Sequence, residues 1–174
     1  MNQVKIIDNI LTKNLIDHVK YLLKDLDFIL AYDHEGLKVF EEENMLQGLS
    51  RNTLDRKNIH ESNQKLYTRL NDIGFVITEL VCKRVNIKYT KIDRFMWNFY
   101  KNGEKGKKHS DTKKENFYSI LYSINTSDGY LEIGNKKIYD VEDEAKIFKS
   151  TIPHQGFGPT KDNFRLNLNI VVEI

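Results

Sequence analysis

Three side chains that can bind a metal lie in the second half of the sequence, at a spacing that lets them share one ion. His109 and Asp111 are separated by one residue, and residues i and i+2 of an extended chain point to the same side. His154 supplies a second imidazole. Two imidazoles and one carboxylate, with other coordination positions open, are typical of sites that hold non-haem iron(II). The pattern therefore predicts a metal site made by His109, Asp111 and His154.

The spacing of these residues is weak evidence when it is taken alone. The chain has 5 histidines and 25 acidic residues, so a His-x-Asp or His-x-Glu pair is expected about 0.7 times by chance. A second feature is needed to support the metal site.

That feature is an arginine on the polar side of the last expected strand. In the segment 164–172, alternation separates Arg165 from the Phe, Leu and Ile side chains, so its guanidinium points inward and requires an anion. Arg165 follows His154 by 11 residues, enough for the chain to turn at Gly156 and Gly158 and return beside the metal. A guanidinium holds a carboxylate through two parallel hydrogen bonds. The anion is either a ligand carboxylate or one of the protein's own acidic side chains.

The order His109-x-Asp111, His154, Arg165 resembles the iron(II)/2-oxoglutarate oxygenase superfamily, and within it the prolyl-4-hydroxylase-like branch. The resemblance covers roughly residues 94–174, and the N-terminal half is similar to the helical cover of small bacterial and phage members. It implies three ligands for Fe(II), an arginine for the distal carboxylate of the cosubstrate 2-oxoglutarate, and O2 as the oxidant. The implied reaction is hydroxylation of an unactivated C–H bond, with release of succinate and CO2.

The same resemblance implies further contacts with the cosubstrate. Tyr122 lies in a strand that reads Ile-Leu-Tyr-Ser-Ile-Asn, and Tyr100 lies before a glycine-containing loop; both are similar to tyrosines that face 2-oxoglutarate in this branch. Asn167 stands where a serine is frequent, and its amide can still donate to a carboxylate. Asp111 argues against halogenating chemistry, because halogenating members lack the carboxylate. Val171 stands where nucleic-acid demethylases carry a second arginine, so nucleic acid is a disfavoured substrate.

The expected secondary structure changes character along the chain. Apolar residues recur at helical spacing in two segments of the first half, whereas short apolar runs separated by Gly, Asn and Asp fill the second half. We expect strands at 4–7 and 28–32, helices at 15–26 and 62–85, a mainly loop segment at 33–58, and strands at 94–100, 117–125, 130–133, 136–139, 145–149 and 164–173.

These elements predict an α+β fold, namely a double-stranded β-helix or jelly roll with the N-terminal helices packed on one face. Residues 1–174 are expected to form a single domain, in which 1–89 are mainly helical cover and loops and 90–174 are the β core with the metal site. The open mouth of such a fold can hold a ligand.

Composition narrows the class of protein. With 40% hydrophobic and 30% charged residues, the chain is typical of a folded globular protein. Its 27 basic and 25 acidic side chains leave a net charge of +2, so no global field attracts nucleic acid or a membrane. Cys82 is the only cysteine, and the start of the sequence lacks a signal-peptide pattern, so we expect a reducing, cytoplasmic setting.

The substrate and the surroundings of the site leave alternatives open. A small molecule or a peptide side chain fits the resemblance. Lysines crowd the loop 101–114 around His109; with parts of 33–58 they are expected to form a mobile rim that attracts an acidic substrate, or else a solvated loop. Two other functions remain: a cupin-like metal enzyme that leaves Arg165 structural, and a non-catalytic jelly-roll binding module in which His109 and His154 never meet.

Overall fold

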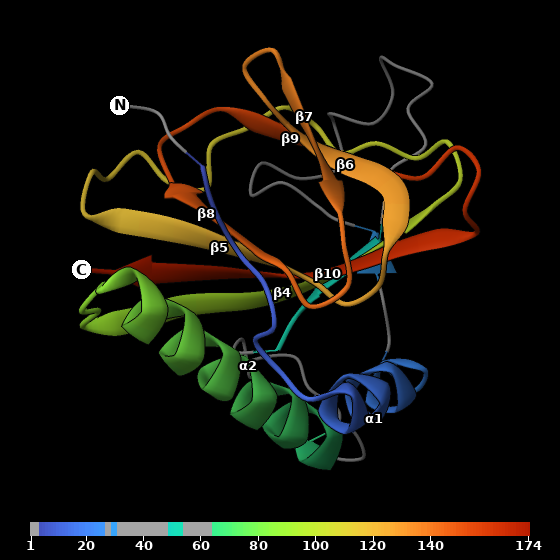
Figure 1. Cartoon of the computed structure of the whole chain (residues 1–174), viewed down its shortest axis with the longest axis horizontal. Coiled ribbons are helices and arrows are strands. Elements are labelled where there is room, and N and C mark those ends of the chain that lie inside the picture. The colour runs from blue at the N-terminus through green and yellow to red at the C-terminus, as the bar shows by residue number, and fades with distance from the viewer. Residues whose placement is uncertain (1–3, 27–28, 31–48, 54–63) are drawn as a thin grey trace.

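The structure is a computed structural model of the chain, and it describes residues 4–26, 29–30, 49–53 and 64–174. These residues form two helices and two sheets whose neighbouring strands are antiparallel. The two sheets lie one above the other, and the helices cover the outer side of the larger sheet (Figure 1). This arrangement confirms antiparallel sheets with helices on one face.

In the described part of the chain, the larger sheet has seven strands in the order β1-β8-β5-β10-β4-β3-β2, and the smaller sheet has three in the order β7-β6-β9. Strand β10 lies at the centre of the larger sheet and pairs with β4 on one side and β5 on the other. Its residues are therefore well placed to carry a rigid site. The bounds are β1 Lys5–Ile7, β2 Ile29–Leu30, β3 Leu49–Asn52, β4 Lys91–Lys101, β5 Phe117–Ser123, β6 Ser127–Ile133, β7 Lys136–Asp140, β8 Ala145–Lys149, β9 His154–Phe157 and β10 Phe164–Glu173.

The two helices bury one apolar stripe each. Helix α1 (Lys13–Leu23) starts after Thr12, whose extended backbone places its carbonyl to accept the first N–H groups of the helix. Helix α2 (Gln64–Val85) packs closely on the sheet, because a Cβ on Gly74 would lie 2.9 Å from Cζ of Phe95. Phe95 is fully buried under the helix, and its truncation to alanine would cost about 3–5 kcal/mol.

The two faces of β10 have different chemistry, and this difference creates the site. One face is apolar and belongs to the core under the helices. The other face is polar, and Arg165 reaches from it to β7 and β9 of the smaller sheet. Across the register with β4, the outward pairs are Leu168 with Trp97 and Ile170 with Phe95, and the inward pairs are Arg165 with Tyr100, Asn167 with Asn98 and Asn169 with Met96.

Most predicted elements are present with small shifts of their ends. Strand β4 begins at Lys91, three residues before the predicted start. Strand β9 was not predicted, because it has four residues, follows a proline and contains Gly156; it is defined by its pairing with β6. Strand β3 lies inside the segment expected as loop. Of the strand expected at 28–32, residues 29–30 are described as β2, and residues 33–48 and 54–58 lie outside the described ranges.

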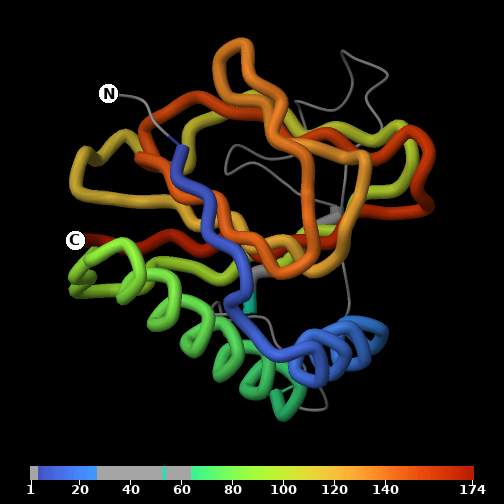
Figure 2. The backbone as a smooth tube through the Cα atoms, in the orientation of Figure 1, coloured from blue at the N-terminus to red at the C-terminus, as the bar shows by residue number. Residues whose placement is uncertain are grey.

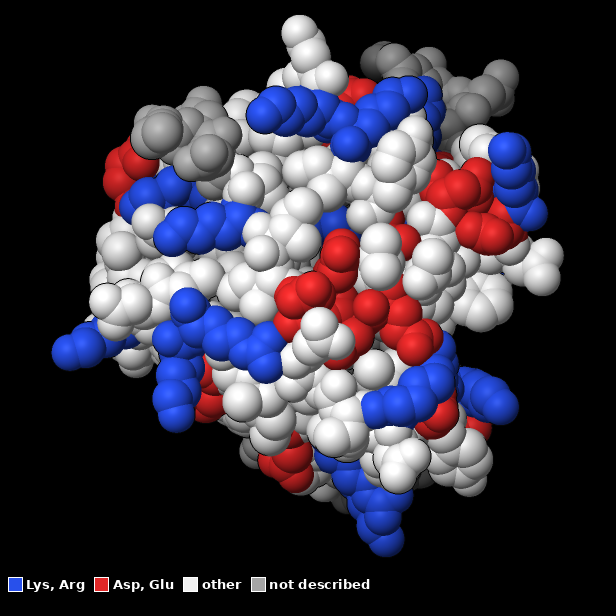
Figure 3. Space-filling view, viewed as in Figure 1, with Lys and Arg blue, Asp and Glu red and all other residues white. Residues whose placement is uncertain are grey.

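The N-terminal strand β1 passes alongside β8 before the chain enters α1 (Figure 2). On the face shown in Figure 3, a central group of acidic side chains is flanked by basic ones. Among the described residues, neither helix is long and apolar enough to cross a membrane.

Candidate metal centre and its polar surroundings

The three predicted metal ligands come together between the sheets. Nε2 of His109 lies 3.6 Å from Oδ1 of Asp111, and Nε2 of His154 lies 3.7 Å from Oδ2 of the same carboxylate. The ligand atoms of all three residues lie within 4.8 Å of one another. Two backbone hydrogen bonds of 2.9 and 2.8 Å pair His109 with His154 and hold the segments that carry the ligands side by side. Atoms at these separations can share one divalent ion.

Hydrogen bonds also orient the two imidazoles. Nδ1 of His109 lies 2.8 Å from the carbonyl oxygen of Lys107, and Nδ1 of His154 lies 3.0 Å from that of Ile152. A carbonyl oxygen only accepts, so each Nδ1 carries a proton. Each Nε2 therefore faces the other two ligands, and in the neutral imidazole it is the nitrogen that can bind a shared metal ion. The His109 side chain is 49% exposed, whereas those of His154 and Asp111 are buried. The centre is therefore more open to solvent on the His109 side.

The carboxylate of Asp111 is held by three side chains of the larger sheet. Arg94 on β4 and Ser119 on β5 donate to its two oxygens, and Nδ2 of Asn169 on β10 lies 3.2 Å from Oδ1. Burial alone would raise the pKa of Asp111, but the hydrogen bond with His109 and the charge of Arg94 hold it well below its usual range. The group is an ionised carboxylate with a fixed orientation, as a metal ligand requires.

Arg94, Ser119 and Asn169 were not predicted as site residues. Strand alternation could have placed Asn169 on the inner face with Arg165, since the two are four residues apart. The side of Arg94 and Ser119 depends on strand register, and only the paired strands of the structure provide it.

The predicted anion-binding arginine is buried between the sheets with an acidic partner. Arg165 is 1% exposed, its Nε donates to Oδ2 of Asp140 at 2.7 Å and its Nη2 to Oδ1 at 3.3 Å. Nη1 lies 3.4 Å from the carbonyl oxygen of Phe157, and the guanidinium lies over the ring of Tyr100, 5.3 Å from its centroid. The protein's own carboxylate is thus one anion for Arg165, and part of its donor capacity remains.

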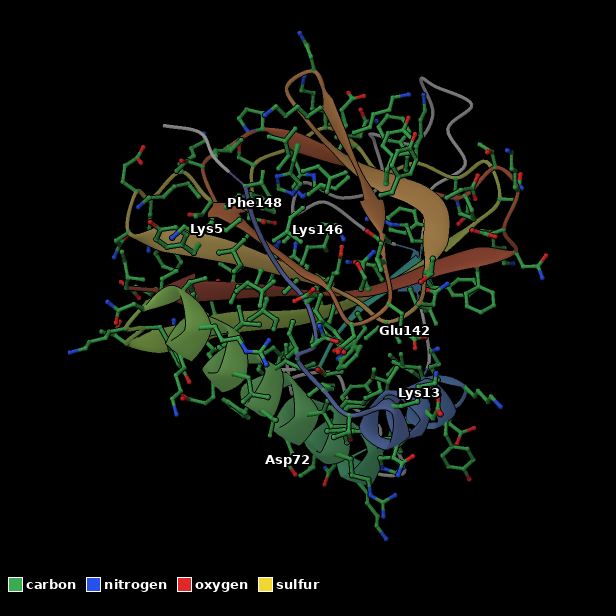
Figure 4. All side chains as sticks on the ribbon, viewed as in Figure 1. Lys5, Lys13, Asp72, Glu142, Lys146 and Phe148 are labelled. Carbon is green, nitrogen blue, oxygen red and sulfur yellow. The ribbon has the colours of Figure 1, made fainter. Side chains whose placement is uncertain are left out.

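A second buried cation shares the same carboxylate. Nζ of Lys146 lies 3.1 Å from Oδ1 of Asp140 and donates to Oγ of Ser123 at 2.8 Å. Burial alone would raise the pKa of Asp140, but the charges of Arg165 and Lys146 lower it. The side chain of Lys146 is fully buried, and its label lies near the middle of the view in Figure 4. Strand alternation could have indicated this position. Ala145 and Ile147 on either side of Lys146 belong to the core under the helices, so Lys146 points to the opposite face of β8.

The expected role of Tyr122 is corrected by the register of β5. Tyr122 pairs with Leu168, so it points to the helix-facing core and away from Arg165. Its hydroxyl donates to Oδ1 of Asp143 at 2.8 Å. The inward residue is its neighbour Ser123, because successive residues of a strand point to opposite faces.

Tyr100 and Asn167 do lie on the inner face. Tyr100 is directly across from Arg165, and burial raises the pKa of its hydroxyl. Asn167 accepts a hydrogen bond of 2.9 Å from Asn98, and within the described structure its buried Nδ2 has no hydrogen-bond partner. Asn169, Asn167 and Arg165 thus form a polar row along β10, from the metal ligands to the guanidinium. An unsatisfied buried donor in that row fits a polar ligand lying along it.

The lysine-rich segment 101–114, which was predicted to form part of a mobile rim, is hydrogen-bonded to neighbouring segments. The N–H of Gly106 donates to the carbonyl of Gly156 at 2.8 Å, and Gly158 donates to Glu104 at 2.7 Å. Such pairing continues through His109, so the segment is fastened to β9 and to the residues after it. A lid built from 101–114 would have to break these hydrogen bonds in order to open. The other part of the predicted rim, 33–48 and 54–58, lies outside the described residues.

Comparisons of the sequence with protein-family models and with curated proteins give no match. The structure is similar to a prolyl hydroxylase from Trichoplax adhaerens solved with a hypoxia inducible factor peptide, with TM-score 0.68, 17% identity and coverage of 99% of this chain and 84% of that one. It is also similar to HygX from Streptomyces hygroscopicus with nickel and 2-oxoglutarate bound, with TM-score 0.68, 8% identity and coverage of 99% and 83%. The chain has the fold of the iron(II)/2-oxoglutarate oxygenases. A viral collagen prolyl hydroxylase from Paramecium Bursaria Chlorella virus-1, in complex with 2-oxoglutarate, shares it with TM-score 0.57, 15% identity and coverage of 98% and 96%.

Proposed function

We propose that the protein is an iron(II)- and 2-oxoglutarate-dependent oxygenase that hydroxylates an unactivated C–H bond and releases succinate and CO2. The observation that carries the proposal is the inner surface of the sheets, where the His109, Asp111 and His154 ligand set and the guanidinium of Arg165 are joined by one polar row. The same proposal takes residues 1–174 as one domain whose two sheets form a double-stranded β-helix.

The donor set fits iron(II). In the described structure the centre has two imidazole nitrogens and one ionised carboxylate, and a set of three leaves coordination positions for other ligands. When bound there with 2-oxoglutarate, iron(II) supplies the activation of O2 that the reaction needs. The chain itself orients the ligands: Lys107 and Ile152 set the imidazole tautomers, and Arg94, Ser119 and Asn169 hold the carboxylate.

The polar row fits a dicarboxylate. Arg165 makes three hydrogen bonds with protein oxygens and has five N–H donors, so donors remain for the distal carboxylate of 2-oxoglutarate. Asn167 offers its unpaired Nδ2 beside them. The ring of Tyr100 lies under the guanidinium, 5.3 Å from it. Fixed charge-assisted donors of this kind orient a cosubstrate without reorganisation.

The substrate is proposed to be a small molecule or a peptide side chain. The similar Trichoplax adhaerens enzyme was solved with a peptide fragment, which supports the second class. The buried, unpaired thiol of Cys82 supports a reducing, cytoplasmic setting.

Anaerobic addition of iron(II) and then 2-oxoglutarate tests the proposal, because their chelate gives a weak visible charge-transfer band. The wild-type protein should give the band, and His154→Ala should lose it together with metal binding. His18→Ala is the matched control, since His18 is exposed on α1. Metal binding without the band would support the cupin-like enzyme, in which the Arg165 and Asp140 pair is structural. Absence of metal binding would support a non-catalytic module.

A further inference from the structure

Three ionisable side chains are buried together at the far end of the polar row. Lys146 and Asp140 have fully buried side chains, and Arg165 is 1% exposed. Nζ of Lys146 and Nη2 of Arg165 both lie within 3.3 Å of one oxygen, Oδ1 of Asp140. Two basic side chains therefore share one carboxylate, and all three are buried away from bulk solvent.

Such a cluster has an uncompensated positive charge. Asp140 is the carboxylate to which both cations are paired in the described structure. A buried charge without a partner is costly, and buried charges in proteins are normally paired or bind an ion. The cluster is therefore one negative charge short of neutrality.

The donors around the cluster come from adjoining strands of the larger sheet. Lys146 donates to Asp140 and Ser123, which leaves the third N–H of an ammonium group. Ser123 pairs in register with Asn167, whose Nδ2 is the unpaired donor of the row. Arg165 lies two residues before Asn167 on the same face of β10. A carboxylate placed there would meet donors from β8 and β10.

We propose that Lys146 is a specificity-determining residue of the cosubstrate site. Its charge exceeds what Asp140 neutralises, so the pocket favours a 2-oxo acid that has a second carboxylate. Asp140 holds the two cations together and neutralises one of their two positive charges. The one positive charge that remains matches the negative charge of a single ligand carboxylate. This inference rests on the proposed function, because it assigns a recognition role at the site where 2-oxoglutarate would bind.

The charge of the cluster can be changed in steps by substitution. Lys146→Met removes the surplus charge and leaves Arg165 neutralised by Asp140. Adding Asp140→Asn to that variant restores one net positive charge on a freed arginine. Lys149→Met is the matched control, because Lys149 is on the same strand but contacts the carbonyl of Glu115 and the ring of Tyr118.

The experiment is calorimetric titration of the protein loaded with Mn(II), without O2, using 2-oxoglutarate and 2-oxopentanoate. The second compound has a methyl group in place of the distal carboxylate. Lys146→Met should weaken 2-oxoglutarate binding by about tenfold or more and leave 2-oxopentanoate binding unchanged. The double variant should recover most of the lost affinity, and Lys149→Met should bind like the wild type.

Two results would overturn the inference while the proposed function stands: equal 2-oxoglutarate affinity in Lys146→Met and the wild type, or equal weakness in the single and double variants. A wild-type protein that binds Mn(II) but not 2-oxoglutarate would overturn both. If Lys146→Met does not fold, Asp140→Asn alone is decisive. That variant raises the net positive charge, so it should bind 2-oxoglutarate more tightly, and unchanged or weaker binding would contradict the role of charge.

Discussion

Gly156 provides a direct test of where the cosubstrate binds. A Cβ at this position would lie 3.0 Å from the hydroxyl oxygen of Tyr100 and 3.1 Å from Nη1 of Arg165. Gly156 has no positive φ, so alanine meets no backbone strain there. The added methyl group must instead displace the ends of these two side chains, at about 1–3 kcal/mol for an overpacked site. If 2-oxoglutarate binds only when the guanidinium is in its wild-type position, this free energy opposes binding. The affinity of the protein for 2-oxoglutarate should then fall about 5-fold to 140-fold.

The assay measures 2-oxoglutarate binding and Mn(II) binding in Gly156→Ala. The same measurements are made on a control variant whose free energy of unfolding is lowered by a similar amount. Gly103→Ala suits this purpose, because Gly103 has φ +77° with nothing within 4 Å of an added Cβ, so its cost is backbone strain in a turn. Thermal unfolding shows whether the two variants are matched in stability. Gly156→Ala should lose 2-oxoglutarate affinity and retain Mn(II) affinity, whereas Gly103→Ala should retain both. Wild-type affinity for 2-oxoglutarate in Gly156→Ala would refute the assignment of Arg165.

Three further outcomes follow from buried groups. Tyr122→Phe should lower the free energy of unfolding by about 1 kcal/mol through loss of the hydrogen bond to Asp143, with no change in 2-oxoglutarate affinity in the same calorimetry. The pKa of Asp140 in the folded protein is below its usual 3.8. Its ion pairs therefore add stability above about pH 4, and this stability is lost as the pH falls through the lower folded pKa. In urea unfolding, the difference in free energy of unfolding between the wild type and Asp140→Asn should shrink below about pH 4. Burial raises the pKa of Cys82 to about 11, so a thiol reagent at about pH 8 should label it only after unfolding.

The metal ligands were predictable from sequence because their geometry is local. Positions 109 and 111 face one way in any extended segment, and this holds wherever the segment lies in the fold. The distance from His154 to them is a tertiary property, and it depends on β9, a strand too short to recognise in the sequence. Chemistry suggested the third ligand, and the backbone pairing of His109 with His154 explains why it is in place.

Tyr122 shows the limit of a strand pattern. The segment 117–124 is almost entirely buried, because one of its faces lies under the helices and the other faces the smaller sheet. Alternation of polar and apolar residues is therefore absent, and the sequence alone does not say which residue faces the site. If the match to the family's strand is placed one residue too early, Tyr122 takes the position that belongs to Ser123. The side chain assigned to the site then points to the opposite face of the sheet. Pairing with β10, whose polar and apolar faces are distinct, determines the correct assignment.

Asp140 and Lys146 were missed for a related reason. Each lies in a segment with several charged neighbours, from 136 to 149, and charged residues in such segments are usually exposed. Their burial results from the two sheets meeting, since Asp140 ends β7 of the smaller sheet and Lys146 lies in β8 of the larger one. Arg165 required an anion, and the sequence could not distinguish the protein's own carboxylate from a ligand. The structure supplies both a carboxylate and a second cation, so the requirement for an anion persists after Asp140 is paired.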